Sequence, residues 1–150
     1  MKAVLENLLP HRPPMLLLSG VLSVDEEGAR CEAVVSRDMP FADGQGNLPG
    51  WVGIELMAQT IAVWGGRHAE SEDRPVNIGL LLGSRKYTSE LNAFPCGARL
   101  IIAADKIIRD GNMGVFHCTI SFNQCTVAEA QLSTYLPPAD ELQQILERSF

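Results

Sequence analysis

The alternation of apolar and polar side chains over residues 29–36 predicts a β-strand with one buried face. The two faces are Ala29, Cys31, Ala33 and Val35 on one side, and Arg30, Glu32, Val34 and Ser36 on the other. An apolar run from Met15 to Val24 predicts a strand before it, and residues 25–28 between the two predict a turn, in which glycine permits positive φ. Together these segments predict a first β-hairpin.

The segment from Trp51 to Trp64 is apolar around nearly its whole circumference, which predicts a buried helix rather than a surface one. Gly65 and Gly66 follow it and predict its C-terminal cap. Before the helix, residues 37–50 (RDMPFADGQGNLPG) predict a long irregular loop, a kind of loop that is often functional. After it, residues 67–75 predict a polar surface loop.

The second half of the chain is rich in strand patterns. The expected strands are Ile78–Leu82, Arg85–Leu91, Ala98–Arg109, Val115–Gln124 and Cys125–Tyr135. Residues 110–112 and 123–124 predict hairpin turns. A short helix over residues 3–9 and a terminal helix over 139–150 complete the pattern. It predicts an α+β fold, one antiparallel sheet wrapped around one buried helix.

Composition and charge narrow the function. The chain has 150 residues, 46% of them hydrophobic, and a formal net charge of −6, which fits one domain spanning residues 1–150. Residues 1–14 form its N-terminal helix and lead-in segment, and residues 137–150 form its C-terminal helical tail. The net acidity argues against nucleic acid as a partner, and the scattered basic residues argue against anionic lipid.

Targeting and metal signals are weak. Four cysteines without a C-x-x-C pair predict neither disulfides nor structural zinc, and we expect no metal. The N-terminus lacks the unbroken apolar stretch of a signal peptide, and residues 44–66 carry Glu55 and several glycines, which argues against a membrane span. We therefore expect a soluble, cytoplasmic protein.

Glu55 is the only charged residue between Gly44 and Gly66. Burial raises the pKa of a carboxyl and a helix N-terminus lowers it, and a carboxyl balanced between the two suits general acid/base work. Gln59, one helical turn further on, is placed to orient it. The alternative is structural: Glu55 caps the preceding loop through backbone N–H bonds.

The start of the same helix is a second candidate site. Residues 49–52 (PGWV) predict unpaired N–H groups at a helix N-terminus, with Gly50 allowing close approach of a ligand. Such donors suit a thioester carbonyl or a developing oxyanion.

Three collinear motifs carry a family resemblance. Residues 9–18 (LPHRPPMLLL) resemble the N-terminal L-P-H-R-x-P-x-L-L motif of β-hydroxyacyl-acyl-carrier-protein dehydratases. Residues 49–59 (PGWVGIELMAQ) are similar to that family's P-G-x-x-x-x-E-x-x-A-Q helix, and residues 83–91 with 95–97 resemble its downstream strand and turn. Residues 42–55 (ADGQGNLPGWVGIE) bring the chain nearest to a divergent branch of predicted dehydratases from aryl-polyene-type pathways.

The resemblance implies the hot-dog fold, a curled antiparallel sheet around one long helix. It implies dehydration of 3-hydroxyacyl thioesters on acyl carrier protein to trans-2-enoyl thioesters, in a fatty-acid or polyene-type pathway. No cofactor is expected beyond the phosphopantetheine arm of acyl carrier protein, or CoA. The residues that we expect to bind substrate are Gly50, Trp51 and Val52 at the helix start, Gln59 beside Glu55, and Arg85, whose charge suits the phosphates of a pantetheine arm.

In that family a loop histidine removes the C2 proton, and an acidic residue protonates the leaving hydroxyl. The acidic role falls to Glu55, but residues 41–50 (FADGQGNLPG) contain no histidine. Three alternatives stay open. Asp43 replaces the histidine, His11 reaches the site from its own or a partner subunit, or a partner subunit supplies the working site. The bland alternatives are that His11 anchors a proline-rich segment and Asp43 organises its loop.

Other candidates have simpler explanations. We expect His117 to be a satisfied histidine on the sheet, His68 a solvated loop residue and Arg85 an exposed edge-strand charge. A hot-dog thioesterase, in which Glu55 activates water, is a second hypothesis. A catalytically silent subunit that pairs with an active dehydratase is a third. The hot-dog fold implies a homodimer or a heterodimer with a related subunit, and higher oligomers are also compatible with it.

Overall fold

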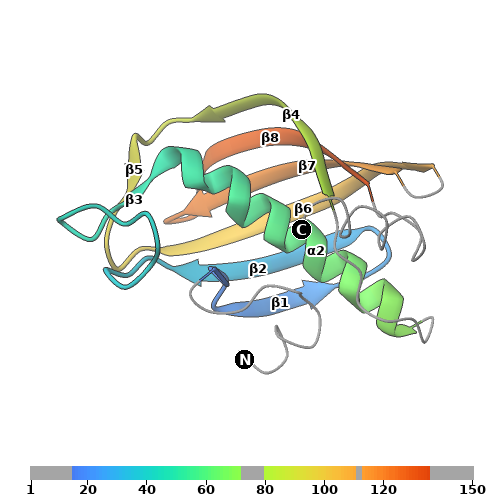
Figure 1. Cartoon of the computed structure of the whole chain (residues 1–150), viewed down its shortest axis with the longest axis horizontal. Helices are drawn as coiled ribbons and strands as arrows, with labels where there is room; N and C mark the ends of the chain where they lie inside the picture. The colour runs from blue at the N-terminus through green and yellow to red at the C-terminus, as the bar shows by residue number, and fades with distance from the viewer. Residues whose placement is uncertain (1–14, 72–79, 111–112, 136–150) are drawn as a thin grey trace, which may run out of the picture.

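The computed structural model describes residues 15–71, 80–110 and 113–135. A six-stranded antiparallel sheet curls around one long helix, α2, which lies across its concave face (Figure 1). The helices expected at residues 3–9 and 139–150, and His11, fall outside the described residues. The predicted α+β architecture is confirmed.

The strands follow the order β1-β2-β6-β7-β8-β4 across the sheet. Their bounds are β1 Gly20–Val24, β2 Gly28–Val34, β4 Leu80–Ser89, β6 Arg99–Asp110, β7 Met113–Phe122 and β8 Cys125–Tyr135. A separate two-stranded sheet pairs β3 (Leu48–Pro49) with β5 (Ala93–Phe94) at the end of the molecule where α2 begins (Figure 1). The β1 and β4 strands are the two edges of the large sheet.

Strand alternation builds the core as the sequence predicts. Ala29, Cys31 and Ala33 of β2 point inward and are buried, as are Phe116 and Cys118 of β7. The helix covers them with its own buried apolar positions, which are Leu56, Met57, Ile61, Val63 and Trp64. The core therefore lies between the concave face of the sheet and α2.

The predicted helix boundaries are wrong at both ends. A 3₁₀ turn over Gly50–Val52 precedes α2, which runs from Gly53 to Ser71. The helix passes through Gly65 and Gly66, because the buried position of Gly66 favours close packing and good helix formers follow it. Residues 67–71, including His68, are therefore helical rather than part of a polar loop.

Two strand predictions also change. Regular pairing of the first strand begins at Gly20 rather than Met15, because the buried Gln59 side chain takes the backbone groups of Met15 and Leu17. The two strands expected over residues 78–91 are one strand, β4, whose register shifts between Arg85 and Thr88. The first hairpin turn is confirmed, and Asp25 Oδ1 accepts the N–H groups of Glu27 and Gly28 within it.

Candidate functional site

The start of α2 is anchored by the short strand pair next to it. The N–H of Gly50 donates to the carbonyl oxygen of Asn92 at 2.8 Å. A Cβ at Gly50 would lie 2.7 Å from the carbonyl oxygen of Leu91, so only glycine fits without a shift of the backbone. The segment just before β5 thus fixes where the helix begins.

This contact corrects one expectation from the sequence. The N–H of Gly50 was expected to be unpaired, and in the structure it is paired with Asn92. The first donor after it along the chain is the N–H of Trp51, which shares a peptide with the Gly50 carbonyl. The roles of Gly50, Trp51 and Val52 in substrate binding stay predictions.

Glu55 lies in the first turn of α2 and is connected to Gln59. Nε2 of Gln59 donates to Oε1 of Glu55 at 3.0 Å, as the spacing of one helical turn predicts. Gln59 itself is 0% exposed. The carboxyl is therefore held by a side chain that is fixed in the core, which is the arrangement that the sequence indicated.

Gln59 also joins α2 to the segment before β1. Its Oε1 accepts the N–H of Leu17 at 3.0 Å, and its Nε2 donates to the carbonyl oxygen of Met15 at 2.8 Å. These bonds set which way the amide faces, because the oxygen side is taken by a donor and the nitrogen side by two acceptors. The Glu55 contact is thus a consequence of the fold.

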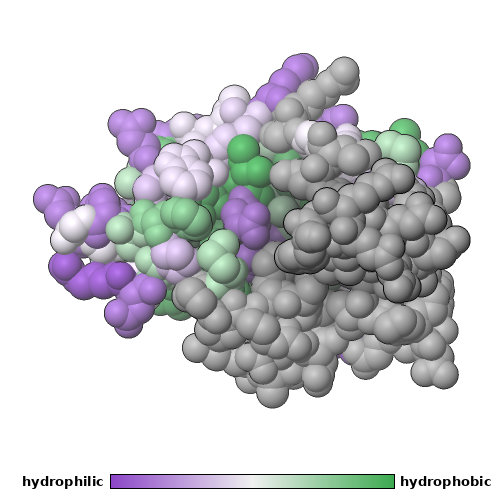
Figure 2. Space-filling model, viewed as in Figure 1, coloured by the Kyte–Doolittle hydropathy of each residue, from purple (hydrophilic) through white to green (hydrophobic). Residues whose placement is uncertain are grey.

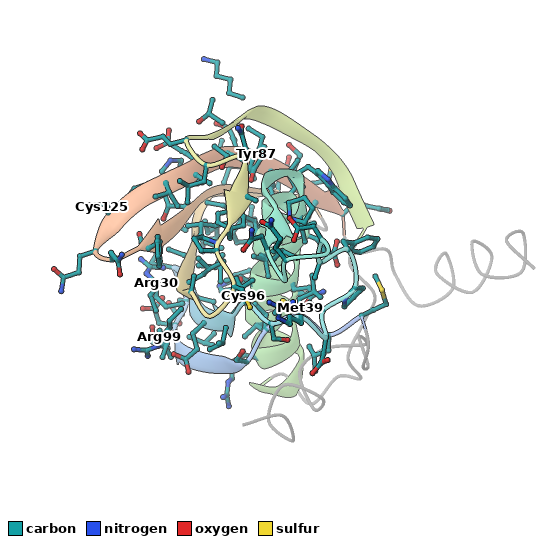
Figure 3. All side chains as sticks on the ribbon, turned by 90° about the vertical axis from the view of Figure 1, so that its left-hand side faces the viewer. Arg30, Met39, Tyr87, Cys96, Arg99 and Cys125 are labelled. Atoms are coloured by element: carbon teal, nitrogen blue, oxygen red, sulfur yellow. The ribbon has the colours of Figure 1, made fainter. Side chains whose placement is uncertain are left out.

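Tyr87, on β4, reaches the same helix start and was missed in the sequence. Its hydroxyl donates a short hydrogen bond to the carbonyl oxygen of Gly50. Burial raises the pKa of the Tyr87 hydroxyl, against the opposing effect of a hydrogen bond with Ser89, so the group stays a proton donor at neutral pH. Figure 3 shows Tyr87 on the end of the molecule where α2 begins.

The loop before the helix is organised by Asp43. Its Oδ1 accepts the N–H groups of Gln45 at 2.8 Å and Asn47 at 3.0 Å, and its own N–H donates to the Asn47 carbonyl. This is the loop-organising alternative, and a catalytic role for Asp43 stays a prediction. Asn47 Oδ1 in turn accepts the N–H of Cys96, which ties the loop to the segment after β5.

An aromatic pair stands at the solvent edge of this loop. The Phe41 and Trp51 rings meet edge to face with centroids 5.2 Å apart, and the two side chains are 48% and 60% exposed. Phe41 adopts φ of +72°, which is rare for a bulky residue. Figure 2 shows hydrophobic residues gathered next to a hydrophilic end of the molecule on the face that α2 covers.

The remaining candidates do not meet at this site within the described residues. His117 lies on β7, with its Nε2 3.7 Å from Oε2 of Glu129 on β8, in agreement with a sheet histidine. Arg85 lies on the edge strand β4, and its side chain, like that of His68, is outside the described part. Catalytic use of His11 stays a prediction.

Metal ligands, membrane-crossing helices and cysteines are the remaining features of chemical interest. No group of three or more His, Cys, Asp and Glu side chains able to hold a metal occurs in the described part of the chain. Over residues 15–71, 80–110 and 113–135, no helix is both long and apolar enough to cross a lipid bilayer. Cys31 and Cys118 are buried, and Cys96 and Cys125 are exposed, all as free thiols.

Comparisons with known proteins agree with the fold and the motifs. A family model described as ApeP-like, ApeP dehydratase, matches residues 3–147. The dehydratase heterocomplex ApeI:P from Xenorhabdus doucetiae is similar with a TM-score of 0.88 and 36% identity, over 95% of this chain and 96% of that chain.

More distant structures share the fold alone. A hypothetical thioesterase with coenzyme A from Streptococcus pneumoniae TIGR4 matches with a TM-score of 0.58 and 16% identity, over 78% of this chain and 84% of that chain. The smu.793 protein bound to acetyl CoA from Streptococcus mutans UA159 matches with a TM-score of 0.64 and 14% identity, over 86% and 95% of the two chains. Together with the first match, they confirm the hot-dog fold.

Proposed function

Since the chain belongs to the ApeP-like family of dehydratases, we propose that it dehydrates 3-hydroxyacyl thioesters carried on acyl carrier protein to trans-2-enoyl thioesters. The observation that carries the proposal is the Glu55 carboxyl, held by the buried Gln59 in the first turn of α2. A carboxyl in that place can protonate a leaving hydroxyl beside donors that polarise a thioester carbonyl.

The reaction is an elimination whose parts can be assigned to atoms. Donors at the start of α2 hold the thioester carbonyl and make the C2 proton acidic. A base takes that proton, the electron pair forms the C2–C3 double bond, and the C3–O bond breaks. Glu55 gives its proton to the departing hydroxyl, which leaves as water. No cofactor is needed beyond the carrier arm that presents the acyl chain.

The base is the open part of this mechanism. Asp43 and His11 are the candidates within the chain, and a histidine from a partner subunit is the third. The ApeI:P relative is a dehydratase heterocomplex. We therefore include in the proposal a partner, a related hot-dog subunit that pairs with this chain and completes the site.

The test is turnover of a 3-hydroxyacyl-acyl carrier protein, followed by mass spectrometry for loss of water. The protein is assayed alone and mixed with a related hot-dog subunit. Glu55→Gln keeps the hydrogen-bonding shape but removes the acidic proton, and we expect enoyl formation to fall by at least about a hundredfold. The matched control is Glu27→Gln, which changes an exposed carboxyl in the first hairpin turn and should leave the rate unchanged.

Full activity of the Glu55→Gln protein would refute the assignment of the acid. Release of free thiol without any enoyl product would identify a thioesterase instead.

Two observations favour a second candidate, a catalytically silent subunit. Residues 41–50 contain no histidine, and the N–H of Gly50 is already bound by Asn92. Under this alternative the protein alone is inert, the mixture is active, and Glu55→Gln leaves the activity of the mixture intact. The same assay therefore separates the two functions.

A further inference from the structure

We propose that Tyr87 is a positioning residue, which holds the Gly50–Trp51 peptide so that the Trp51 N–H is directed at the thioester carbonyl. This inference rests on the proposed function, since it assumes that a thioester binds at the start of α2. The Trp51 N–H would then bind the thioester carbonyl, and the Tyr87 side chain would set the direction of that N–H.

The hydrogen bond from Tyr87 to Gly50 fixes the orientation of one peptide. In a trans peptide the C=O and the following N–H point in opposite directions in one plane. Because the Tyr87 hydroxyl and the N–H of Gly53 both donate to the Gly50 oxygen, the orientation of this peptide is fixed. The N–H of Trp51 consequently points away from Tyr87.

The N–H group of Gly50 lies on the other side of that residue and has its own partner. This N–H is already paired with Asn92, so it is not available to a ligand. The peptide that follows is therefore the first one whose N–H can meet a carbonyl. A hydroxyl that donates to the oxygen of a peptide also polarises its N–H, which strengthens that donor.

A register shift in β4 brings Tyr87 to the start of α2. Between Arg85 and Thr88, β4 advances three residues while its partner β8 advances two, from Gln131 to Glu129. The extra residue makes a β-bulge, and Lys86 within it has φ of +56°. Bulges re-aim side chains next to functional sites, and this one turns Tyr87 toward the helix while Lys86 is exposed.

The absence of a side chain at Gly53 leaves room for the Tyr87 hydroxyl. A Cβ at Gly53 would lie 2.2 Å from the Tyr87 oxygen and 3.1 Å from Cδ1 of Ile120. The first residue of α2 is thus without a side chain at the point where the tyrosine approaches. Gly53 and Tyr87 together form the contact that aims the peptide.

The test uses the carbonyl stretch of a bound thioester, because turnover alone cannot distinguish aim from folding. A 3-hydroxyacyl-acyl carrier protein labelled with ¹³C at the thioester carbonyl is bound to the Glu55→Gln protein, with the related subunit added. Infrared difference spectra are then compared with those of the Glu55→Gln/Tyr87→Phe protein. We expect the stretch to move to higher frequency when the hydroxyl is removed, since the Trp51 donor is then weaker and less well aimed.

The control is Tyr135→Phe in the same background, which removes the other tyrosine hydroxyl at the far end of β8. It should leave the frequency unchanged. An unchanged frequency in the Tyr87→Phe protein would overturn the inference. Failure of the thioester to bind the Glu55→Gln protein would overturn the proposed function, and the inference with it. A shifted frequency, together with no enoyl product from the wild-type protein mixed with the related subunit, would support the inference and refute only the proposed reaction.

A second measurement tests the contact without substrate. Gly53→Ala should lower the urea midpoint of the wild-type protein and lower it less in a Tyr87→Phe background, where the clashing oxygen is absent. With the hydroxyl still in place, turnover with Gly53→Ala should fall about tenfold in kcat with little change in KM. Additive losses of stability would contradict the contact.

Discussion

Gln59 is the residue on which the candidate site depends most directly. Its single amide satisfies a backbone donor at Leu17, a backbone acceptor at Met15 and the carboxyl of Glu55. A fully buried amide is stable only when its polar atoms are paired, so the three contacts support one another. The acid of the proposed reaction is therefore oriented by the same group that fixes the N-terminal segment on the helix.

Replacing Gln59 with leucine should be costly for this reason. Leu17 N–H and Met15 C=O lose their partners, and we expect the free energy of unfolding to fall by about 1–3 kcal/mol in urea denaturation. The control is Gln131→Leu on the opposite, half-exposed face of β8, which should change stability by no more than about 0.5 kcal/mol. Equal effects of the two variants would show that the buried network contributes nothing.

At the scale of an element, the bulge in β4 is the feature that most affects the site. Lys86 holds a left-handed conformation there, which costs a residue with a Cβ about 1–2 kcal/mol. The same bulge places Tyr87 against the start of α2, where its hydroxyl bonds to Gly50. Local strain and the position of a polar group are linked in one short segment.

Substitutions at Lys86 should separate backbone strain from side-chain loss. Lys86→Val puts a β-branched residue at positive φ and should lower stability by about 1–3 kcal/mol, measured from thermal or urea unfolding. Lys86→Gly removes the same charged side chain but relieves the strain, so stability should be unchanged or slightly higher. A valine variant as stable as the glycine variant would contradict the conformation described for the bulge.

Elements of this chain differ in how well sequence alone predicts them. The buried face of β2 was predicted correctly, because alternation depends only on neighbours in the chain. The end of α2 was not, because the helix continues through Gly65 and the buried Gly66 despite a local helix penalty of about 1 kcal/mol per glycine. Likewise, Glu55 and Gln59 could be paired from their spacing, whereas the contact of Tyr87 with Gly50 requires knowledge of a bulge and a register.

At the scale of the whole molecule, one edge of the large sheet is formed by β4. An edge strand presents unpaired backbone groups that can pair with another chain. If the proposed partner pairs there, the sheets of the two subunits become continuous, and the bulge with Tyr87 lies close to the boundary between subunits. The site and the interface would then share one strand.

Hydrogen exchange can test this assembly. On addition of a related hot-dog subunit, amides of residues 80–89 should exchange more slowly, while amides of β1 at the opposite edge should be unchanged. Light scattering on the same samples should show a dimer or larger species. Protection confined to β1, or a monomer in both samples, would contradict the expected arrangement.

The two buried cysteines make the free energy of unfolding depend on pH in alkaline solution. Burial raises the pKa of Cys31 from 9.0 to about 12, partly opposed by a hydrogen bond with Thr60. Burial, and then the charge of Asp105, raise the pKa of Cys118 to about 12 as well. Between pH 9 and pH 12 the two thiols lose their protons in the unfolded chain but keep them in the folded chain. The free energy of unfolding is therefore undiminished below pH 9 and declines toward pH 12.

We therefore expect the urea midpoint to fall steeply above pH 9, and less steeply after Cys31→Ala or Cys118→Ala. Each buried thiol contributes up to about 1.4 kcal/mol per pH unit in that range. The matched variant is Cys125→Ala, which changes an exposed thiol and should leave the slope as in the wild-type protein. Identical slopes in all variants would show that the thiols are not responsible.

The two tryptophans of the chain lie in opposite environments, which makes them separate optical reporters. Trp51 is 60% exposed beside Phe41 at the start of α2, whereas Trp64 is 3% exposed, with its Nε1 bonded to the carbonyl of Glu26. A soluble quencher should extinguish the red-shifted emission of Trp51 and leave the blue-shifted emission of Trp64. Binding of the proposed acyl carrier should thus be followed through the first signal and unfolding of the core through the second, in unlabelled protein.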